Sequence, residues 1–430
     1  MKIFLKKKLR SGALQFTVFV SVIIALLLAA VILLAYTHGF FMKQSKAIVE
    51  NVQLADTGIA ALKNETLITG DTIILPLKGA PEDQRLKIHL SRWGLFEKAY
   101  AEATHRKKRF AKCALMGSGI TANERPAIYL TETFTPLAIV GSTEIRGKAF
   151  LPQQGIRPGN IAGNSYYGNQ LLYGEMKKSE TNLPKLKYDY LRELDYYLTK
   201  FIPASDKDYI SVAPGTKQIN SFQNQVKGYY SPESIVLSEV ALYGNIIIRS
   251  DKKVIIRKET DLRNIIVAAP VIEIEEGFKG NLQAFADTTI KVGNDCLLYY
   301  PSALILIEKE KAMAPDLPNE FYNKIFISEN SELRGSVCYF AIPGQLPDYK
   351  VNIFSDAQSI IHGEIYCEGN LEIKGNVDGS IYTHQFLTNE AGSIFVNHLY
   401  NVKVSSEDLP EAFGGILFDK GTKNVIKWLY

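Results

Sequence analysis

The most apolar stretch of the chain runs over residues 13–36 and holds 24 residues without a single charge. At about 1.5 Å per residue, an α-helix of this length reaches roughly 36 Å, which exceeds a hydrocarbon core of about 30 Å. A lone segment inside that core must be helical, because no neighbouring strand is there to bond its backbone. The pattern therefore predicts a transmembrane helix over 13–36, with the lipid bilayer as its partner.

A second hydrophobic pattern continues over residues 37–65. Its apolar residues recur at spacings of 4, 3, 4 and 3, namely Ile48, Val52, Ala55, Ile59 and Leu62. This spacing places them on one side of a helix, with polar residues on the other side. Gly58 lies within the stripe and lowers its helix propensity slightly. We expect the membrane helix to continue beyond the bilayer as an amphipathic stalk.

Short strand patterns replace the helical pattern from residue 66. The segments 72–77 and 85–90 are apolar or alternate in polarity, and the residues between them are typical of a turn. Residues 96–117 allow two structures. Their first half has helical propensity, but the alternation of the second half equally predicts a hairpin that turns at 104–108.

The next part of the chain changes character twice. Residues 136–174 contain seven glycines between short apolar pieces, which is typical of brief strands joined by tight bends. Residues 176–230 are polar and rich in tyrosine, and they contain apolar residues at spacings of 3, 4 and 3: Leu191, Leu194, Leu198 and Phe201. We therefore predict a β-rich region over 66–233 with a helical, tyrosine-rich insertion at about 176–230.

Residues 234–404 have a repeated texture. Strands of three to five residues recur about every 8–11 residues, with Asn, Asp and Gly at the corners. The aliphatic residues expected to point inward form the pairs Ile246 and Ile248, Ile272 and Ile274, Ile290 and Val292, Ile325 and Ile327, and Leu371 and Ile373. The absence of αβ alternation argues against a doubly wound sheet. A sandwich or barrel allows this spacing, but a parallel β-helix also explains the aliphatic ladders and the residues at the bends.

These patterns predict a mainly β fold, in which an N-terminal transmembrane helix extends into an amphipathic helix. A short-stranded β region and a right-handed parallel β-helix follow. Residues 234–404 are similar to right-handed β-helices, including bactofilin-like polymer-forming proteins and pectin-lyase-like enzymes, and this resemblance implies the architecture rather than an activity. The apolar-aromatic tail over 405–430 is expected to cap the solenoid, because the last coil otherwise exposes an unpaired edge.

Charge orients the predicted membrane helix. The chain has 49 Lys and Arg against 45 Asp and Glu, and five basic residues precede the apolar stretch: Lys2, Lys6, Lys7, Lys8 and Arg10. The positive-inside rule keeps this leader cytoplasmic and sends the rest of the chain outward. We expect a single-pass protein of the bacterial inner membrane with a periplasmic or extracellular C-terminal domain. A cleaved signal peptide is the competing interpretation, but its apolar core would be shorter. The basic run at 106–110 lacks interleaved aromatic residues, so we expect no nucleic-acid partner.

The N-terminal arrangement resembles that of type IV pilins and type II secretion pseudopilins. The basic leader over 1–12 ends in Gly12, and a long helix with an apolar first half follows. The resemblance implies cleavage by a prepilin peptidase between Gly12 and Ala13. Thr17 would then occupy the fifth mature position, where most members have glutamate, although certain minor pilins at fibre tips also lack it. The alternative is an ordinary signal anchor.

Candidate chemistry is sparse. Glu273 and Glu275 lie two apart on a strand and so share one face, as a pair of catalytic carboxylates would, but outward charges also keep such a face soluble. A second acidic set consists of Asp356, Glu364 and Glu368. The sequence shows no catalytic motif in the context that its mechanism needs. We expect no cofactor.

The histidines and cysteines allow two structural predictions. His362 and His384 are 22 residues apart and could stack in a solenoid whose coils are near 20 residues. Cys338 and Cys367 could bridge neighbouring coils in an oxidising compartment, or be small buried apolar residues. The four cysteines stand singly, so we expect no structural zinc site.

These observations favour a membrane-anchored structural or assembly protein rather than an enzyme. We expect a minor pilin-like component of a pilus or secretion apparatus, with other envelope or pilus-assembly proteins as partners. The alternative is an envelope-bound polysaccharide lyase or hydrolase, or a glycan-binding module, on the β-helix, in which case a glycan is the partner.

Overall fold

The computed structural model describes residues 11–64, 70–77, 83–105, 108–187, 190–309, 322–342, 344, 349–419 and 421–429. The predicted basic leader before Ser11 and most of the polar insertion after residue 309 lie outside the described residues. Within the described chain the fold is mainly β, with one long N-terminal helix and a large parallel sheet.

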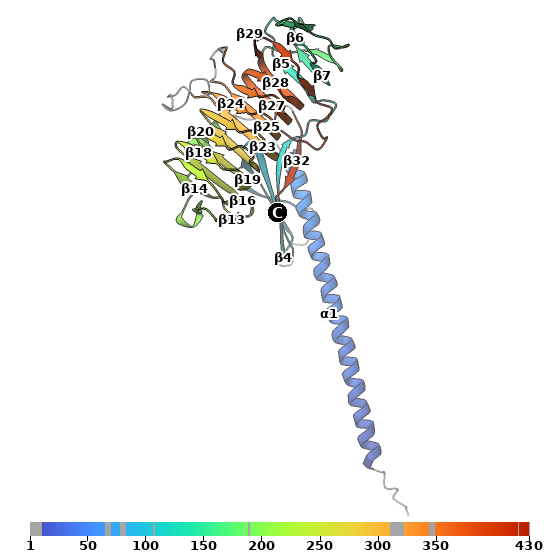
Figure 1. The fold of residues 1–430 in the computed structure, drawn as a ribbon. Helices are drawn as coiled ribbons and strands as arrows, with labels where there is room; N and C mark the ends of the chain where they lie inside the picture. Colours follow the sequence, from blue (N-terminus) through green and yellow to red (C-terminus); the bar gives the residue numbers. More distant parts are fainter. Residues whose placement is uncertain are drawn as a thin grey trace, which may run out of the picture.

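Helix α1 (Ser11–Asn64) is continuous over 54 residues and contains both predicted helical segments. Its first half projects away from the rest of the molecule (Figure 1). Burial begins at Ala47 and recurs at Asn51, Ala55, Ile59 and Leu62. Ile48 is 48% exposed, so Ala47 takes the place on the buried stripe that the spacing assigned to Ile48.

A five-stranded antiparallel sheet packs against the second half of α1. Its strands, in spatial order, are β1 (Thr72–Leu75), β2 (Arg85–Trp93), β3 (Phe96–His105), β4 (Lys108–Ser118) and β32 (Lys423–Trp428). The hairpin alternative for residues 96–117 is therefore confirmed, and the helical alternative is wrong. The small residues Ala99, Ala101 and Ala103 alternate along β3 and all face α1, so burial against the helix outweighs local helical propensity.

Gly58 has a packing role in this contact. A Cβ atom at Gly58 would lie 2.9 Å from Cβ of Ala101 and 3.0 Å from Cδ1 of Leu86. The glycine therefore lets α1 approach the sheet closely, at the expense of some helix propensity.

Most of the other strands form a parallel β-helix. The first coils use β13 (Lys217–Asn220), β14 (Lys227–Ser231), β15 (Ile235–Leu237), β16 (Ala241–Gly244), β17 (Ile246–Ser250) and β18 (Lys253–Ile256). The following coils use β19 (Asp261–Ala268), β20 (Val271–Ile274), β21 (Lys279–Ala286), β22 (Thr289–Val292), β23 (Leu297–Ile307) and β24 (Lys324–Ile327). The last coils of this run use β25 (Glu332–Phe340), β26 (Ile353–Ser355), β27 (Ile360–Ile373) and β28 (Asn376–Glu390). Each strand pairs in parallel with its counterpart one coil away, as Ile247 does with Ile266.

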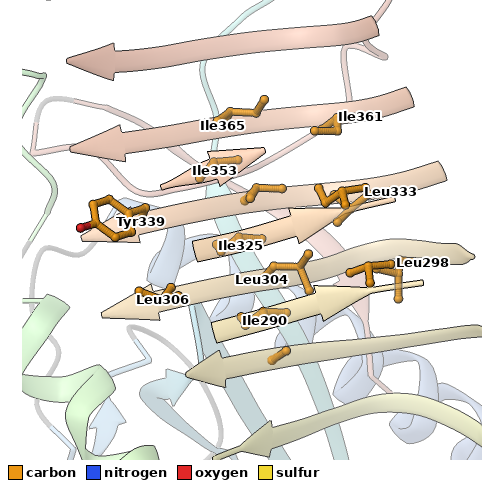
Figure 2. Close-up of a cluster of buried hydrophobic side chains, with 14 of the residues drawn as sticks. Ile290, Leu298, Leu304, Leu306, Ile325, Leu333, Tyr339, Ile353, Ile361 and Ile365 are labelled. Carbon is orange, nitrogen blue, oxygen red and sulfur yellow. The ribbon is translucent and has the colours of Figure 1, made fainter. Parts of the chain in front are cut away.

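The interior of the β-helix is a stack of aliphatic ladders (Figure 2). All five predicted inward pairs are buried, with none of their residues more than 4% exposed. Successive coils superimpose these pairs directly, since Ile272 aligns with Ile290 and Ile290 aligns with Ile325. Polar asparagines occupy the corners, where Asn281 donates its side-chain N–H to the carbonyl of Tyr299, 2.7 Å away. The periodic pattern is thus confirmed residue by residue.

The β-helix also includes a segment from the N-terminal side, which the predicted boundary at 233/234 had separated. Strands β5 (Pro126–Leu130), β6 (Leu137–Val140), β7 (Glu144–Arg146), β8 (Lys148–Leu151), β9 (Ile156–Pro158) and β12 (Met176–Lys178) form its last coils. Ile128 in β5 pairs in parallel with Ile381 in β28. Strands β30 (His398–Tyr400) and β31 (Lys403–Ser405) pair with β6 and β7. Where β5 pairs with β28, the β-helix therefore combines strands from residues 126–178 with strands from residues 376–405.

The remaining elements connect these parts. They are β10 (Asn160–Ile161), β11 (Asn164–Ser165), β29 (Ser393–Val396), α2 (Tyr190–Thr199) and η1 (Asp206–Asp208). Helix α2 contains Leu194 and Leu198 of the predicted spacing, both buried, and Tyr197 stacks on Phe285 of the β-helix at 5.1 Å. Phe201 is also buried but lies after the end of the helix, and strands β12, β13 and β14 also lie within the predicted insertion, which is therefore only partly helical. The tail does not cap an open coil, because β32 completes the antiparallel sheet instead.

Candidate functional site

The exposed half of α1 is the first part of the candidate site. Helix α1 is long and apolar enough to cross a membrane, and the 18-residue window that meets the hydropathy criterion is not buried at all. Leu14, Leu34 and Phe41 are each about 70% exposed or more. Gly12 lies at the start of the helix, and a Cβ atom placed on it would have no described atom from another part of the chain within 4 Å.

The antiparallel sheet is the second part, because it joins α1 to the β-helix. One face of the sheet contacts α1, and the other face places Trp93, Phe96 and Leu115 against the outer side of the β-helix. The turn between β2 and β3 is hydrogen-bonded to the side chain of Gln283. This amide accepts a hydrogen bond from N–H of Leu95 at 2.8 Å and donates one to the carbonyl of Trp93 at 3.0 Å.

A buried ion pair links β3 to the edge strand β32 near the same end of the sheet. Nζ of Lys423 in β32 lies 2.6 Å from Oε2 of Glu97 in β3, and the two side chains are 2% and 0% exposed. Strand β4 lies between these two strands. The pair therefore ties the C-terminal strand to the sheet across an intervening strand.

Residues 409–419 form a strap that leads from the β-helix to β32. Arg125 is only 2% exposed and donates hydrogen bonds to backbone carbonyls of the strap, including that of Phe413 at 3.1 Å. The hydroxyl of Tyr300 donates to the carbonyl of Gly414 at 2.9 Å and accepts from its N–H at 3.0 Å. Oε2 of Glu364 accepts from N–H of Ile416 at 2.9 Å. Three side chains of the β-helix thus hold one short piece of backbone.

The carboxyl group of Glu364 has an unusual environment. Burial raises its pKa from 4.5 to about 7, although the N–H of Ile416 and the charge of Arg125 act in the opposite direction. Because the folded state binds the proton more tightly than the unfolded chain, this group stabilises the fold fully below about pH 4.5 and loses that contribution as pH rises through about 7.

We expect the Glu364→Gln protein to lack this dependence, because the amide oxygen can still accept the N–H of Ile416. Relative to the variant, the natural protein should lose about 3 kcal/mol of unfolding free energy between about pH 4.5 and pH 7.5. Urea unfolding of both proteins across this range measures the difference. Glu368 and Glu372, whose pKa values burial also raises, remain in both proteins and cancel in the comparison. Parallel pH curves for the two proteins would contradict the assignment.

The structure places the predicted carboxylate pair in a ladder of ion pairs. Glu273 lies 2.8 Å from Nζ of Lys253, and Glu275 lies 2.6 Å from the guanidinium of Arg257. Each partner belongs to the preceding coil. The hydrogen bond from Arg257 lowers the pKa of Glu275, which suits a permanently charged surface group rather than a general acid.

The second acidic set is divided among separate backbone contacts. Glu364 holds the strap, Glu368 accepts the N–H of Ala341 at 3.0 Å, and Asp356 accepts the N–H of Ala357 at 2.8 Å. Each carboxylate thus serves a different piece of backbone. In the described part of the chain, no group of three or more His, Cys, Asp or Glu side chains is arranged to hold a metal ion.

The predicted histidine stack is wrong. His362 aligns with Asp378 on the next coil and lies 3.1 Å from its carboxylate. His384 instead lies beside Thr131, with Nδ1 3.1 Å from its hydroxyl. Coils at this point are 16 residues apart, as Ile365 and Ile381 show, so a separation of 22 residues does not place two side chains in register.

The structure leaves Cys338 and Cys367 as free, buried thiols. On their neighbouring strands Cys338 aligns with Tyr366, whereas Cys367 aligns with Tyr339. The two cysteines are therefore one position out of register and point to opposite faces of the sheet, Cys338 outward and Cys367 into the β-helix core. Burial raises the pKa of both thiols, as expected for small apolar core residues.

Several residues of this site were not evident in the sequence. Arg125, Gln283 and Lys423 are single polar residues in or beside strand patterns, where an outward, solvated position is the default expectation. Only the three-dimensional contacts reveal that all three are buried.

Comparisons of the chain with protein-family models, with curated proteins and with solved structures found no match.

Proposed function

We propose that this protein is a membrane-anchored, extracytoplasmic structural or assembly protein, and specifically a minor pilin-like component of a pilus or secretion apparatus. The observation that carries the proposal is the division of α1. One uninterrupted helix has an apolar, exposed first half and a second half that packs on an antiparallel sheet. A plain anchor needs only the first half.

The division gives each half a separate task. The exposed half suits the bilayer before assembly and contact with the helices of other subunits after it. The packed half connects rigidly to the sheet through the stripe from Ala55 to Leu62. The sheet in turn is seated on the β-helix, which becomes a stiff head at the end of the helix (Figure 1). Other envelope or pilus-assembly proteins are the partners in this proposal.

Orientation follows from charge. The basic leader stays in the cytoplasm of the inner membrane, and the sheet and the β-helix lie in the periplasm or outside the cell. The alternative of a lyase or hydrolase has less support, because Glu273 and Glu275 are each held in an ion pair that also accounts for them as surface charges.

N-terminal sequencing of the mature protein from cell envelopes tests the pilin-like part. We expect the mature chain to begin at Ala13 and the Gly12→Val protein to keep its leader. A Gly39→Val protein is the matched control, because Gly39 also lies in the exposed half of α1, and no described residue from another part of the chain comes within 4 Å of its Cβ position. It should be processed normally. A natural chain that begins at Met1 in the envelope would remove the pilin-like function and leave a signal anchor.

A further inference from the structure

A half-open pocket of about 560 Å³ lies where the antiparallel sheet meets the outer side of the β-helix. Its wall is built from the starts of β19, β21 and β23 and from Lys427 in the edge strand β32. The side chains that bear on its chemistry are Asp261, Arg263, Asn264, Lys279, Tyr299 and Lys427. We call it the junction pocket. Its volume is typical of sites for small ligands.

The junction pocket carries an excess of positive charge. Its one carboxylate, that of Asp261, is already bound by the guanidinium of Arg263 at 3.0 Å and by the hydroxyl of Tyr243 at 2.5 Å. Lys279 and Lys427 have no ion-pair partner in the described part of the chain. Arg263, Lys279 and Lys427 therefore outnumber the single acid by two charges.

The position of Lys427 makes its positive charge unfavourable in the absence of an anion. The side chain is partly buried, and burial together with the nearby charge of Arg263 lowers its pKa. An anion bound between Lys427 and its basic neighbours would relieve this repulsion in a site that water only partly screens. A carboxylate or another small anion fits that requirement.

Two further features favour a sugar as the carrier of the anion. Tyr299 lines the pocket and is 42% exposed, so its ring offers an apolar face with a polar edge. Oδ1 of Asn264 is buried and has no hydrogen-bond partner among the described residues. After a small rotation of the amide, it can accept a hydrogen bond from a ligand hydroxyl, which would remove the cost of leaving it unpaired.

We propose that the junction pocket binds a uronate unit of an acidic polysaccharide, without turnover. The carboxylate lies among Arg263, Lys279 and Lys427, the sugar ring lies on Tyr299, and a hydroxyl donates to Asn264. This goes beyond the anchoring role, because it would hold the head of a membrane-anchored protein to an anionic glycan.

Titration calorimetry on the full-length protein in detergent micelles tests the proposal. The probes are trimers of galacturonate, mannuronate and glucuronate, the corresponding methyl esters, and inorganic phosphate. We expect at least one free-acid trimer to bind, with its ester at least tenfold weaker and phosphate weaker still. Failure of all three acids to bind would overturn the proposal. So would equal binding of acid and ester, or phosphate binding as tight as that of the trimer, since the last would indicate a simple anion site.

Variants then place the binding in the pocket. Lys279→Gln and Lys427→Gln should each weaken binding of the trimer at least tenfold. Lys178→Gln is the control, because Lys178 is an exposed lysine on β12 in a distant coil of the same β-helix. Binding that all three variants leave unchanged, or reduce equally, would show that the trimer is held elsewhere and would overturn the assignment. Since N-terminal processing is measured separately, failure here leaves the anchoring function untouched.

Discussion

Replacing Gly363 by alanine is expected to lower the free energy of unfolding of the β-helix by more than about 3 kcal/mol. Gly363 has φ of +157°, and a Cβ atom there would lie 1.7 Å from the carbonyl oxygen of Gly335 on the preceding coil. Gly335 and Gly379 have the same conformation and meet the same obstacle. The obstacle is backbone that takes part in the parallel ladder, so the coils must separate to make room.

Gly277→Ala separates this clash from the ordinary effect of replacing a glycine. Gly277 also has positive φ, at +77°, but among the described residues none apart from its two chain neighbours comes within 4 Å of its Cβ position. Its replacement should cost only about 1 kcal/mol, because strain is then confined to one residue. Urea unfolding of full-length proteins in detergent, followed by far-ultraviolet circular dichroism, compares the two. Similar midpoints for Gly363→Ala and Gly277→Ala would contradict the stacked-glycine argument.

Elements with a strong local period were predictable. The apolar stretch and the stripe that follows it specify α1, because a helix needs only neighbours three and four residues away. The inward pairs such as Ile290 and Val292 were predictable for the same reason, since alternate residues of any strand share a face. The spacing of apolar residues within one helix or strand does not depend on which coils of the β-helix are neighbours.

The parallel pairing of β5 with β28 inside the β-helix could not be predicted in that way. Ile128 and Ile381 pair although 253 positions separate them along the chain. Both segments have the same texture, so each could stack on many others. The choice depends on the fit between complete coils, and the coil lengths vary because insertions such as the one after Ile307 interrupt the repeat. Errors in register follow directly, as in the predicted stack of His362 on His384.

The candidate site combined predictable and unpredictable parts. The apolar, exposed half of α1 was evident, because a long uncharged stretch can be recognised from composition alone. The cleavage point after Gly12 stays a prediction. The strap was not evident, because Glu364 and Arg125 are charged residues whose burial depends on backbone from residues 409–419. A charged residue within a strand pattern is ordinarily expected to face solvent. Such a residue can be buried only when another segment of the chain supplies hydrogen-bond or ion-pair partners for it.

The antiparallel sheet is therefore the mechanical link of the molecule. Its N-terminal strands come directly after α1, whereas its edge strand β32 comes from the other end of the chain. The sheet cannot be completed until the whole β-helix has been synthesised. Loss of β32 would expose the edge of β4 and weaken the packing of α1 on the sheet, so the contacts that hold β32 determine how firmly α1 is connected to the β-helix.

Replacing Lys423 by methionine is expected to lower the free energy of unfolding by about 3 kcal/mol, because it leaves the carboxylate of Glu97 buried without its partner. The loss should lie near the lower end of the range for a broken buried pair, since Lys187 lies nearby and can partly compensate. Burial and then the charge of Lys423 lower the pKa of Lys187, so removing Lys423 relieves that repulsion.

The double replacement Glu97→Gln with Lys423→Met is the decisive comparison. It removes both charges, so most of the lost stability should return, whereas independent effects would add. Hydrogen exchange locates the damage. Amides of β32 and β4 should exchange faster in Lys423→Met, while those of β23 in the β-helix should not change. A double variant no more stable than the single one would mean that Lys423 acts through packing of its aliphatic chain rather than through its charge, and the sheet edge would then be held by shape alone.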